Sequence, residues 1–222
     1  LRDGEGFIAR ARSLFTPEHN TQEVFLRLRA EFNASSDVEA RSLLFLYLNR
    51  HSYNGLVRYN SKGIYNVPFG KYKAPYFPER ELTAFLTKLR DCDVAFAVQD
   101  FRATFSQLRK GDVVYCDPPY DGTFSGYHTD GFTEDDQYHL ASILEHRSSE
   151  GHPVIVSNSD TSLTRSLYRN FTHHYIRAKR SIGIAAGEGK FATEMIATKS
   201  AKWFSADFSR GRDSTVIFGV QV

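Results

Sequence analysis

The chain of 222 residues has little of what marks secreted, membrane or strongly charged proteins. Its two cysteines, Cys92 and Cys116, fit a reducing compartment better than a disulfide framework. No stretch approaches the length of apolar sequence that spans a bilayer, and no signal peptide is visible at the N-terminus. The formal net charge is only +2, so bulk charge alone predicts no partner.

The distribution of charge is more informative than its sum. Residues 41–80 hold seven lysines and arginines against one acid, Glu79, which is a difference of +6. Six tyrosines are interleaved with them. Basic and aromatic side chains together suit a polyanion with stackable bases, which is to say a nucleic acid. A solvated, loop-rich surface beside a core is the alternative, and composition does not separate the two.

The first half of the chain is predicted to be helical and to end in a long loop. Residues 5–32, with a break at 16–21, and residues 36–50 have helical periodicity, and Ser36 or Asp37 is the expected cap of the second segment. Residues 51–78 are punctuated by Asn-Gly, Lys-Gly and Pro-Phe-Gly, which predicts an ordered, hairpin-containing loop. A loop this long in a compact domain is usually functional.

From residue 79 onward helices alternate with strands. Helices are predicted at 79–89, 102–109, 133–149 and 161–170, and strands at 94–101, 113–116, 153–159, 173–181, 193–199 and 214–222. The alternation and the unbroken Val/Ile runs predict an α/β fold with a largely parallel sheet covered on both faces. Two adjacent histidines, His173 and His174, lack partner ligands at a useful spacing, so no metal site is expected.

The motif Asp117-Pro118-Pro119-Tyr120 follows the predicted strand 113–116. Ligands in open α/β sheets bind at the carboxyl ends of the strands, where Asp117 is placed. The prolines remove backbone donors, so the Asp117 carboxylate and the Pro118 carbonyl form a rigid row of acceptors beside the flat face of Tyr120. Such a row suits a planar aromatic amine with two N–H bonds. A turn with a capping aspartate is the alternative, but Asp-Pro-Pro-Tyr at a strand end is much rarer than Asp-Pro.

This motif resembles the Asp/Asn-Pro-Pro-Tyr/Phe/Trp motif of the amino-methyltransferases, which binds the exocyclic amine to be methylated. Further segments, 47–78, 112–133, 154–161 and 177–182, are similar to Dam-type DNA adenine-N6 methyltransferases of the D12 class. The resemblance implies a partial Rossmann-like methyltransferase sheet and a helical, hairpin-containing target-recognition region. It also implies methyl transfer from S-adenosyl-L-methionine to an adenine flipped out of double-stranded DNA, expected in GATC.

The resemblance assigns roles to particular residues. Asp117, Pro118, Pro119 and Tyr120 are the expected catalytic residues, and Asp117 is also expected to contact the cofactor. Tyr53 matches the aromatic wedge that fills the gap beside the flipped base. Lys71 stands where an arginine can occur in the family, and lysine keeps the charge that holds phosphate but not the planar fork that reads a base. The full set of expected DNA-binding residues is Tyr53, Asn54, Leu56, Arg58, Pro68, Lys71 and Tyr72. Core packing is the alternative for Tyr53 and Leu56.

The family's cofactor-binding segment is expected to precede this chain. Its glycine-rich strand–loop and its ribose-binding acid have no match in the sequence, and the G-x-G-x-x-A pattern at 187–192 reads as a solvent loop. Without the family's first two strands, the strand at 94–101 is expected to have no neighbour and to expose an apolar edge. The isolated chain is therefore expected either to be poorly stable or to be completed by a separate N-terminal segment, which would also complete the cofactor site.

Two functions stay open at this point. One is a DNA adenine-N6 methyltransferase, encoded by a bacterium or a phage and located in the cytoplasm. The other is a DNA-binding fragment without transfer activity, because the cofactor loop is absent. The expected regions are a DNA-binding region at 1–90, the catalytic part of the methyltransferase domain at 91–200, and a tail of unknown role at 201–222.

Overall fold

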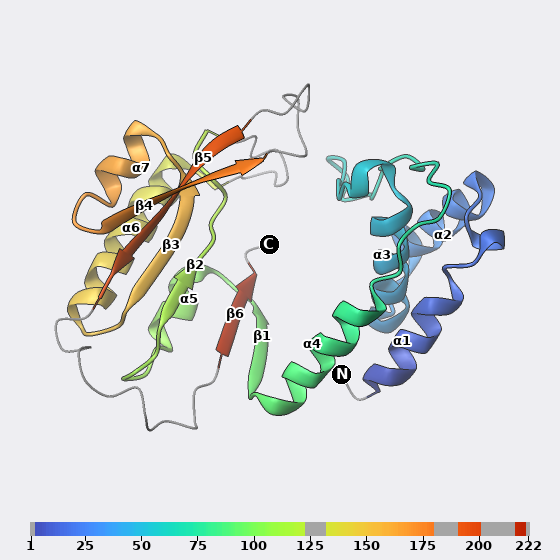
Figure 1. Ribbon diagram of the computed structural model, residues 1–222, viewed down its shortest axis with the longest axis horizontal. Coiled ribbons are helices and arrows are strands. Elements are labelled where there is room, and N and C mark those ends of the chain that lie inside the picture. The colour runs from blue at the N-terminus through green and yellow to red at the C-terminus, as the bar shows by residue number, and fades with distance from the viewer. Residues whose placement is uncertain (1–2, 123–131, 180–190, 201–215, 221–222) are drawn as a thin grey trace. The chain divides into compact units, whose positions relative to one another are not determined.

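A computed structural model describes residues 3–122, 132–179, 191–200 and 216–220 of the chain. The chain divides into two compact units, Leu1–Cys92 and Asp93–Val222, which are described in turn (Figure 1).

The first unit is helical. Its helices are α1 (Gly4–Ser13), α2 (Gln22–Ala34), α3 (Val38–His51) and α4 (Glu79–Asp91), with single turns η1 (Pro17–His19) and η2 (Tyr53–Gly55). Asp37 caps α3, because its carboxylate accepts a hydrogen bond of 2.6 Å from the Ala40 N–H. The buried side chains of α2 and α3 meet two residues of the following loop, and the cluster consists of Phe25, Leu28, Phe32, Leu44, Tyr47, Leu48, Tyr65 and Val67. The predicted helices and the long loop are therefore confirmed.

The second unit contains a four-stranded sheet in the order β2-β3-β5-β4. Its strands are β2 (Val114–Cys116), β3 (Val154–Ser159), β4 (Thr172–Lys179) and β5 (Phe191–Lys199). The helices are α5 (Phe101–Ser106), α6 (Glu134–Ser149) and α7 (Ser162–Leu167). Helix α6 packs on β3, and α5 and α7 pack on α6. The core lies between α6 and the sheet, where Leu140 and Leu144 meet Val114, Val154 and Val156.

The unit has the expected α/β character, but the sheet differs from the prediction in two respects. Only β2 and β3 pair in parallel, whereas β5 runs antiparallel to both β3 and β4. A parallel crossover needs a dozen or more residues, usually with a helix, and only residues 180–190 connect β4 to β5. Within this unit the described helices cover one face of the sheet. On the other face the Tyr115 side chain is 65% exposed.

The strand at 94–101 was expected to have no neighbour, and that expectation is wrong. Strand β1 (Val94–Val98) pairs in parallel with β6 (Val216–Val220), a strand from the predicted tail. The apolar run of β6 therefore satisfies one edge of β1, since an open row of backbone donors and acceptors pairs readily with an added strand. The rest of the tail, residues 201–215 and 221–222, lies outside the described residues.

One buried histidine should make stability depend on pH. His51 is fully buried, its ring stacks on Tyr47 with centroids 3.9 Å apart, and burial lowers its pKa from 6.5 to about 4. Between those values the unfolded chain binds a proton that the folded chain does not, so stability falls as pH falls. At pH 5 the free energy of unfolding should be about 2 kcal/mol lower than at pH 8 on account of this group.

Urea unfolding at pH 8 and pH 5 measures this effect. In His51→Gln the difference between the two pH values should shrink, while the exposed-residue control His174→Gln should keep it. An unchanged pH dependence in His51→Gln would contradict a neutral, buried imidazole.

Candidate functional site

The Asp117-Pro118-Pro119-Tyr120 turn begins at the carboxyl end of β2, as predicted, beside the end of β3. The Ser157 hydroxyl donates a hydrogen bond of 2.7 Å to Oδ1 of Asp117 and lies 3.3 Å from the Cys116 carbonyl oxygen. Asp117 is exposed. An ionised carboxylate has room for about four hydrogen bonds, so the bond from Ser157 orients Asp117 and leaves acceptor capacity for a ligand.

Two buried amides hold the other side of the turn. Gln137 on α6 donates from Nε2 to the Pro119 carbonyl oxygen at 2.8 Å. Asn158 on β3 accepts at Oδ1 from the Asp121 N–H at 2.8 Å and donates from Nδ2 to Oε1 of Gln137 at 3.1 Å. The backbone on both sides of Tyr120 is thus fixed by side chains from a helix and from a neighbouring strand.

The Pro118 carbonyl differs from that of Pro119. Within the described part of the chain, no hydrogen bond to the Pro118 oxygen is found, although each neighbouring polar group that is named above has a partner. The sequence predicts that this carbonyl and Asp117 act together as two acceptors for a group with two N–H bonds, and that stays a prediction.

The aromatic and sulfur groups beside the turn are electrically neutral at physiological pH. Burial raises the pKa of Tyr120, and the Asp117 and Glu194 carboxylates act in the same direction against a hydrogen bond from Ser157. Burial, followed by the Asp117 charge, raises the pKa of Cys116 to about 12. Tyr120 therefore offers a neutral ring, and Cys116 is no nucleophile because the thiolate is not formed.

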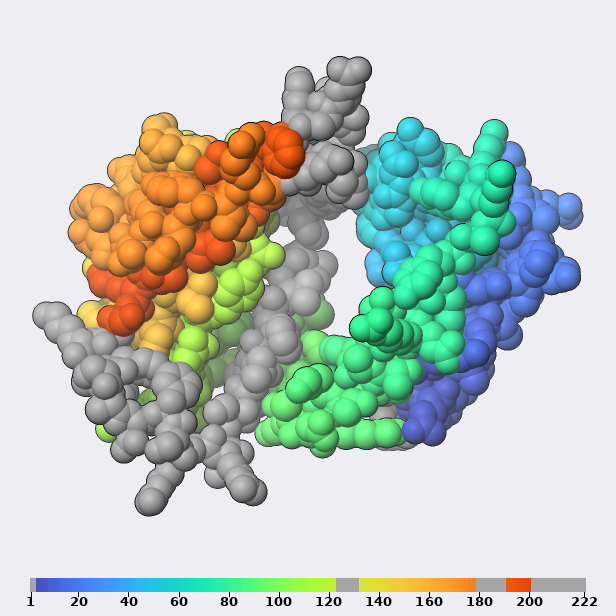
Figure 2. Space-filling view, viewed as in Figure 1, coloured from blue at the N-terminus to red at the C-terminus, as the bar shows by residue number. Residues whose placement is uncertain are grey.

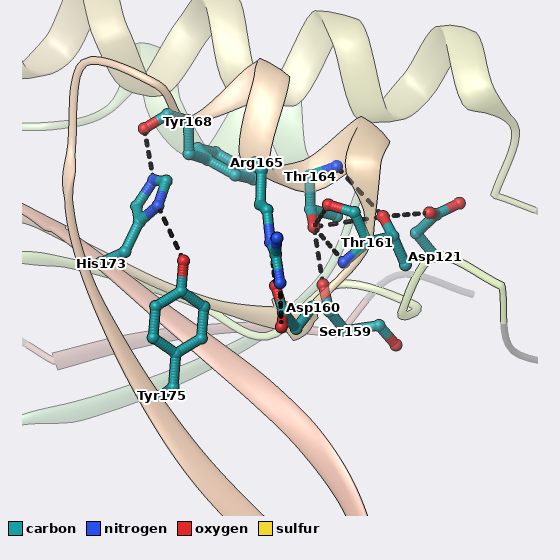
Figure 3. Close-up of polar contacts among 9 residues, drawn as sticks. All are labelled: Asp121, Ser159, Asp160, Thr161, Thr164, Arg165, Tyr168, His173 and Tyr175. Carbon is teal, nitrogen blue, oxygen red and sulfur yellow. Dashed lines mark hydrogen bonds and ion pairs between the residues drawn. The ribbon is translucent and has the colours of Figure 1, made fainter.

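The turn is also tied to the start of α7 (Figure 3). The Thr161 hydroxyl donates to Oδ2 of Asp121 at 2.6 Å, and the Thr164 hydroxyl donates to the Ser159 carbonyl at 2.7 Å. These two threonines form the capping box of α7. Beside them the Asp160 carboxylate accepts two bonds from Arg165, which lowers the pKa of that carboxyl group.

Sequence reasoning missed the residues that support the turn, which are Asp121, Gln137, Ser157, Asn158 and Thr161. The signal was present in 154-VIVSNSDT-161, where an apolar strand ends in a run of polar residues. The five polar residues of this segment, 157–161, form or directly follow the carboxyl end of β3, beside β2. The topology of an α/β sheet gathers site residues at this edge. Gln137 gave no such signal, because only the packing of α6 brings it to Pro119.

The loop 51–78 of the first unit is anchored by Tyr65, which is fully buried. Its hydroxyl is 2.8 Å from Ser52 Oγ and donates to the Leu56 carbonyl at 2.9 Å. Asn33 on α2 bonds both the N–H and the carbonyl of Tyr65. Isolated antiparallel bridges, Ser52 to Phe69 and Tyr59 to Tyr65, give the loop a hairpin-like course.

Six of the seven predicted DNA-binding residues are exposed on this loop. They are Tyr53, Asn54, Arg58, Pro68, Lys71 and Tyr72. The seventh, Leu56, is half-buried against the core of the first unit. The Tyr53 N–H donates to the Pro68 carbonyl at 2.9 Å, which brings these two positions together. In the space-filling view the segment is drawn in cyan to green on the surface of this unit (Figure 2).

Two of these positions have an unusual backbone. Asn54 and Lys71 have φ values of 53° and 56°, in the left-handed region. Such conformations are uncommon for residues other than glycine and are concentrated in functional loops. Arg58 donates from Nε to Asn66 Oδ1 at 2.8 Å, which orients its guanidinium and leaves further N–H donors for a ligand.

Within the part of the chain that the structure describes, no cluster of three or more His, Cys, Asp or Glu side chains could hold a metal ion. None of the helices within it is both long and apolar enough to cross a membrane. Residues 187–190 of the G-x-G-x-x-A pattern lie outside it.

Comparison with known proteins relates the chain to one enzyme family. The model of the D12 class N6 adenine-specific DNA methyltransferases matches residues 2–182. The chain is 60% identical over 223 aligned positions to the Retron Ec67 DNA adenine methylase of Escherichia coli, which covers 99% of this chain and 77% of that protein. It is 44% identical to the DNA adenine methylase of Salmonella typhi, with 89% of this chain and 72% of that protein aligned. With the DNA adenine methylase of Serratia marcescens it shares 46% identity, over 80% of this chain and 67% of that protein.

The two cysteines should report on the packing behind the turn. Cys92 is exposed, whereas Cys116 is partly covered and has a pKa of about 12. At pH 8 Cys92 should react with a disulfide reagent, and Cys116 should react more than about a hundredfold more slowly, since only the thiolate attacks. Timed labelling of the folded chain and of Cys92→Ser, with an unfolded sample as reference, measures this. Rapid labelling of the folded Cys92→Ser variant would contradict the buried position of Cys116.

Proposed function

Because the chain belongs to the D12 class N6 adenine-specific DNA methyltransferases, we propose that it methylates an adenine flipped out of a GATC site, with S-adenosyl-L-methionine as the donor. The chain is thus a DNA adenine methyltransferase by family, and the proposal concerns its site, cofactor and sequence preference. The observation that carries the proposal is the turn after β2, where the Asp117 carboxylate keeps acceptor capacity beside its bond from Ser157 and no hydrogen bond to the Pro118 oxygen is found within the described residues.

The turn supplies what the adenine amine needs. Its two N–H bonds match the Asp117 carboxylate and the Pro118 carbonyl, and the base stacks on Tyr120. Acceptance of both N–H bonds increases electron density on the amine nitrogen, which makes that nitrogen a better nucleophile. The rigid Pro118-Pro119 backbone keeps the acceptors in place, so that little reorganisation accompanies the reaction.

The exposed loop 51–78 is proposed to bind the DNA duplex. Its aromatic residue Tyr53 is 53% exposed and is available to enter the stack beside the flipped base. Arg58 is proposed to read a base in the major groove, where a guanidinium makes two bonds to guanine. Lys71 retains positive charge without the planar fork of arginine, so it is proposed to contact phosphate.

The residues present fit only one side of the cofactor site. Asp117 is the one residue assigned toward S-adenosyl-L-methionine, whose sulfonium methyl is the group transferred. A glycine-rich turn between a strand and a helix, which lets a cofactor approach the backbone, is not found among the described residues. The chain's own residues therefore account for binding and activating the amine, and not for binding the rest of the methyl donor.

We further propose that a separate N-terminal segment completes the donor side. Exposed apolar side chains on β1 and β2 support this, since Val98 is 73% and Tyr115 65% exposed. In this proposal residues 1–90 bind DNA, residues 91–200 hold the amine, and β6 of the 201–222 region supports β1. A cytoplasmic location follows from bacterial DNA as the substrate.

The alternative function is DNA binding without methyl transfer by this chain alone. One experiment separates the two. The chain is incubated with labelled S-adenosyl-L-methionine and a GATC duplex, and in parallel with a scrambled duplex. Incorporation into the GATC duplex alone establishes a complete donor site, whereas specific binding without incorporation establishes the alternative. Equal binding to both duplexes, with no incorporation into either, would sink the proposed specificity.

Asp117→Ala should abolish methyl transfer, in the chain or in the chain completed by its N-terminal segment, and should leave affinity for a duplex without GATC, which involves no bound amine, within about twofold. Removal of the carboxylate takes away an acceptor that the reacting amine needs, whereas the DNA-binding loop is on the other unit. Transfer assays and fluorescence anisotropy on the same preparation measure the two effects. Parallel loss of binding and transfer would argue against a catalytic role for Asp117.

Arg58→Ala should relax the sequence preference by roughly 1–3 kcal/mol, because a base contact is lost. Lys62→Ala is the matched control, since it removes the same charge from an exposed position of the same loop. Binding of both variants to GATC and scrambled duplexes is compared over a range of salt concentrations. If Arg58→Ala weakens binding to every sequence equally, Arg58 contacts phosphate instead.

A further inference from the structure

We propose that Gln137 and Asn158 are positioning residues that determine which carbonyl of the Pro118-Pro119 pair is presented to the adenine amine. Gln137 engages the Pro119 oxygen, which leaves Pro118 as the carbonyl of the pair with no hydrogen bond among the described residues. The inference rests on the proposed function, because it concerns the same amine. Neither residue touches the reacting atoms, so each acts through the backbone of the turn.

The direction of every bond in this network is fixed by chemistry. Oδ1 of Asn158 receives the N–H groups of Asp121 and Ser159, each at 2.8 Å, and a backbone N–H can only donate. The Asn158 nitrogen is therefore directed at Gln137, where it donates to Oε1 at 3.1 Å. That leaves the Gln137 nitrogen to donate to the Pro119 oxygen at 2.8 Å, and a carbonyl can only accept.

Burial makes each hydrogen bond of this network costly to lose. Asn158 is fully buried and Gln137 is 4% exposed, so no bulk water replaces a lost bond. Both residues lie on regular elements, β3 and α6, and α6 is fixed at its start by a capping box between Thr133 and Asp136. The position of the Pro119 oxygen is thus set by a helix and a strand, with two amides between them.

The prolines explain why outside support is needed. Neither Pro118 nor Pro119 has an N–H, so the turn cannot close with backbone bonds of its own at these positions. Its two carbonyls are chemically alike, and an unsupported turn has no means of presenting one in preference to the other. The donor from Gln137 distinguishes them, since it engages Pro119 and draws that carbonyl away from the site.

The test compares two GATC duplexes, one with the target adenine and one with purine, which lacks the 6-amino group. The ratio of their dissociation constants measures amine binding, and the cost of opening each duplex cancels between protein variants. Gln137→Leu and Gln137→Glu each remove the donor to Pro119, and they differ in charge. In both variants the ratio of dissociation constants should shift in favour of the purine duplex by roughly twofold to tenfold, as expected for loss of one neutral hydrogen bond between the amine and the Pro118 oxygen.

Two further variants serve as the positive and the negative control. Asp117→Ala, which removes an acceptor, should shift the ratio in the same direction. Gln107→Glu makes the same chemical change at an exposed amide of the same unit and should leave the ratio unchanged. A purely structural role for Gln137 would weaken binding to both duplexes equally and would leave the ratio at the wild-type value.

Each outcome decides a different claim. If Asp117→Ala shifts the ratio and both Gln137 variants do not, the positioning role is overturned and the proposed function stands. If Asp117→Ala also leaves the ratio unchanged, amine binding at this turn is overturned, and the inference falls with it. Should the Gln137 variants unfold, Asn158→Asp replaces them. It keeps the acceptor for Asp121 and Ser159 but cannot donate to Gln137, and the same shift is expected.

Discussion

The site depends on one constraint, which is that two consecutive prolines leave the turn after β2 without backbone donors at positions 118 and 119. The carbonyl groups of such a turn are available as acceptors, but few backbone hydrogen bonds within the turn stabilise its conformation. The structure compensates from three directions, with Ser157 on Asp117, Gln137 on Pro119 and Thr161 on Asp121. Helix α6, helix α7 and strand β3 share a hydrophobic core that includes Leu144 and Val156. The packing of this core brings the side chains of Ser157, Gln137 and Thr161 to the turn.

The same logic applies to the loop of the first unit, although the chemistry differs. There a buried tyrosine, Tyr65, takes the place of the amide pair. Its ring fills the core and its hydroxyl bonds Ser52 and Leu56, so the segment between them projects outward with Tyr53 exposed. Both regions thus combine a rigid interior anchor with an open polar surface, which limits the reorganisation needed when a ligand binds.

The sequence predicted local features well, and it failed where distant segments meet. The helices, their caps and the position of Asp117 after a strand follow from periodicity and from the chemistry of Asp and Pro. Pairing of β1 with β6 could not be predicted, because nothing in an isolated strand identifies its neighbour. Gln137 was missed for a related reason, since one polar residue on a mostly polar helix gives no signal until packing buries it.

In the proposed function, the division of acceptors in the turn accounts for selectivity toward the amine. An amine with two N–H bonds needs two acceptors at a fixed spacing, and a third exposed carbonyl nearby would allow a second, unreactive pose. With Pro119 engaged by Gln137, the turn has one arrangement in which both N–H bonds are satisfied, through Asp117 and Pro118. Binding in a single pose brings the amine nitrogen into reacting position more often, which is how orientation lowers an activation barrier. The buried amides Gln137 and Asn158 are thus proposed to contribute to catalysis by excluding an alternative pose of the amine, although they touch no reacting atom.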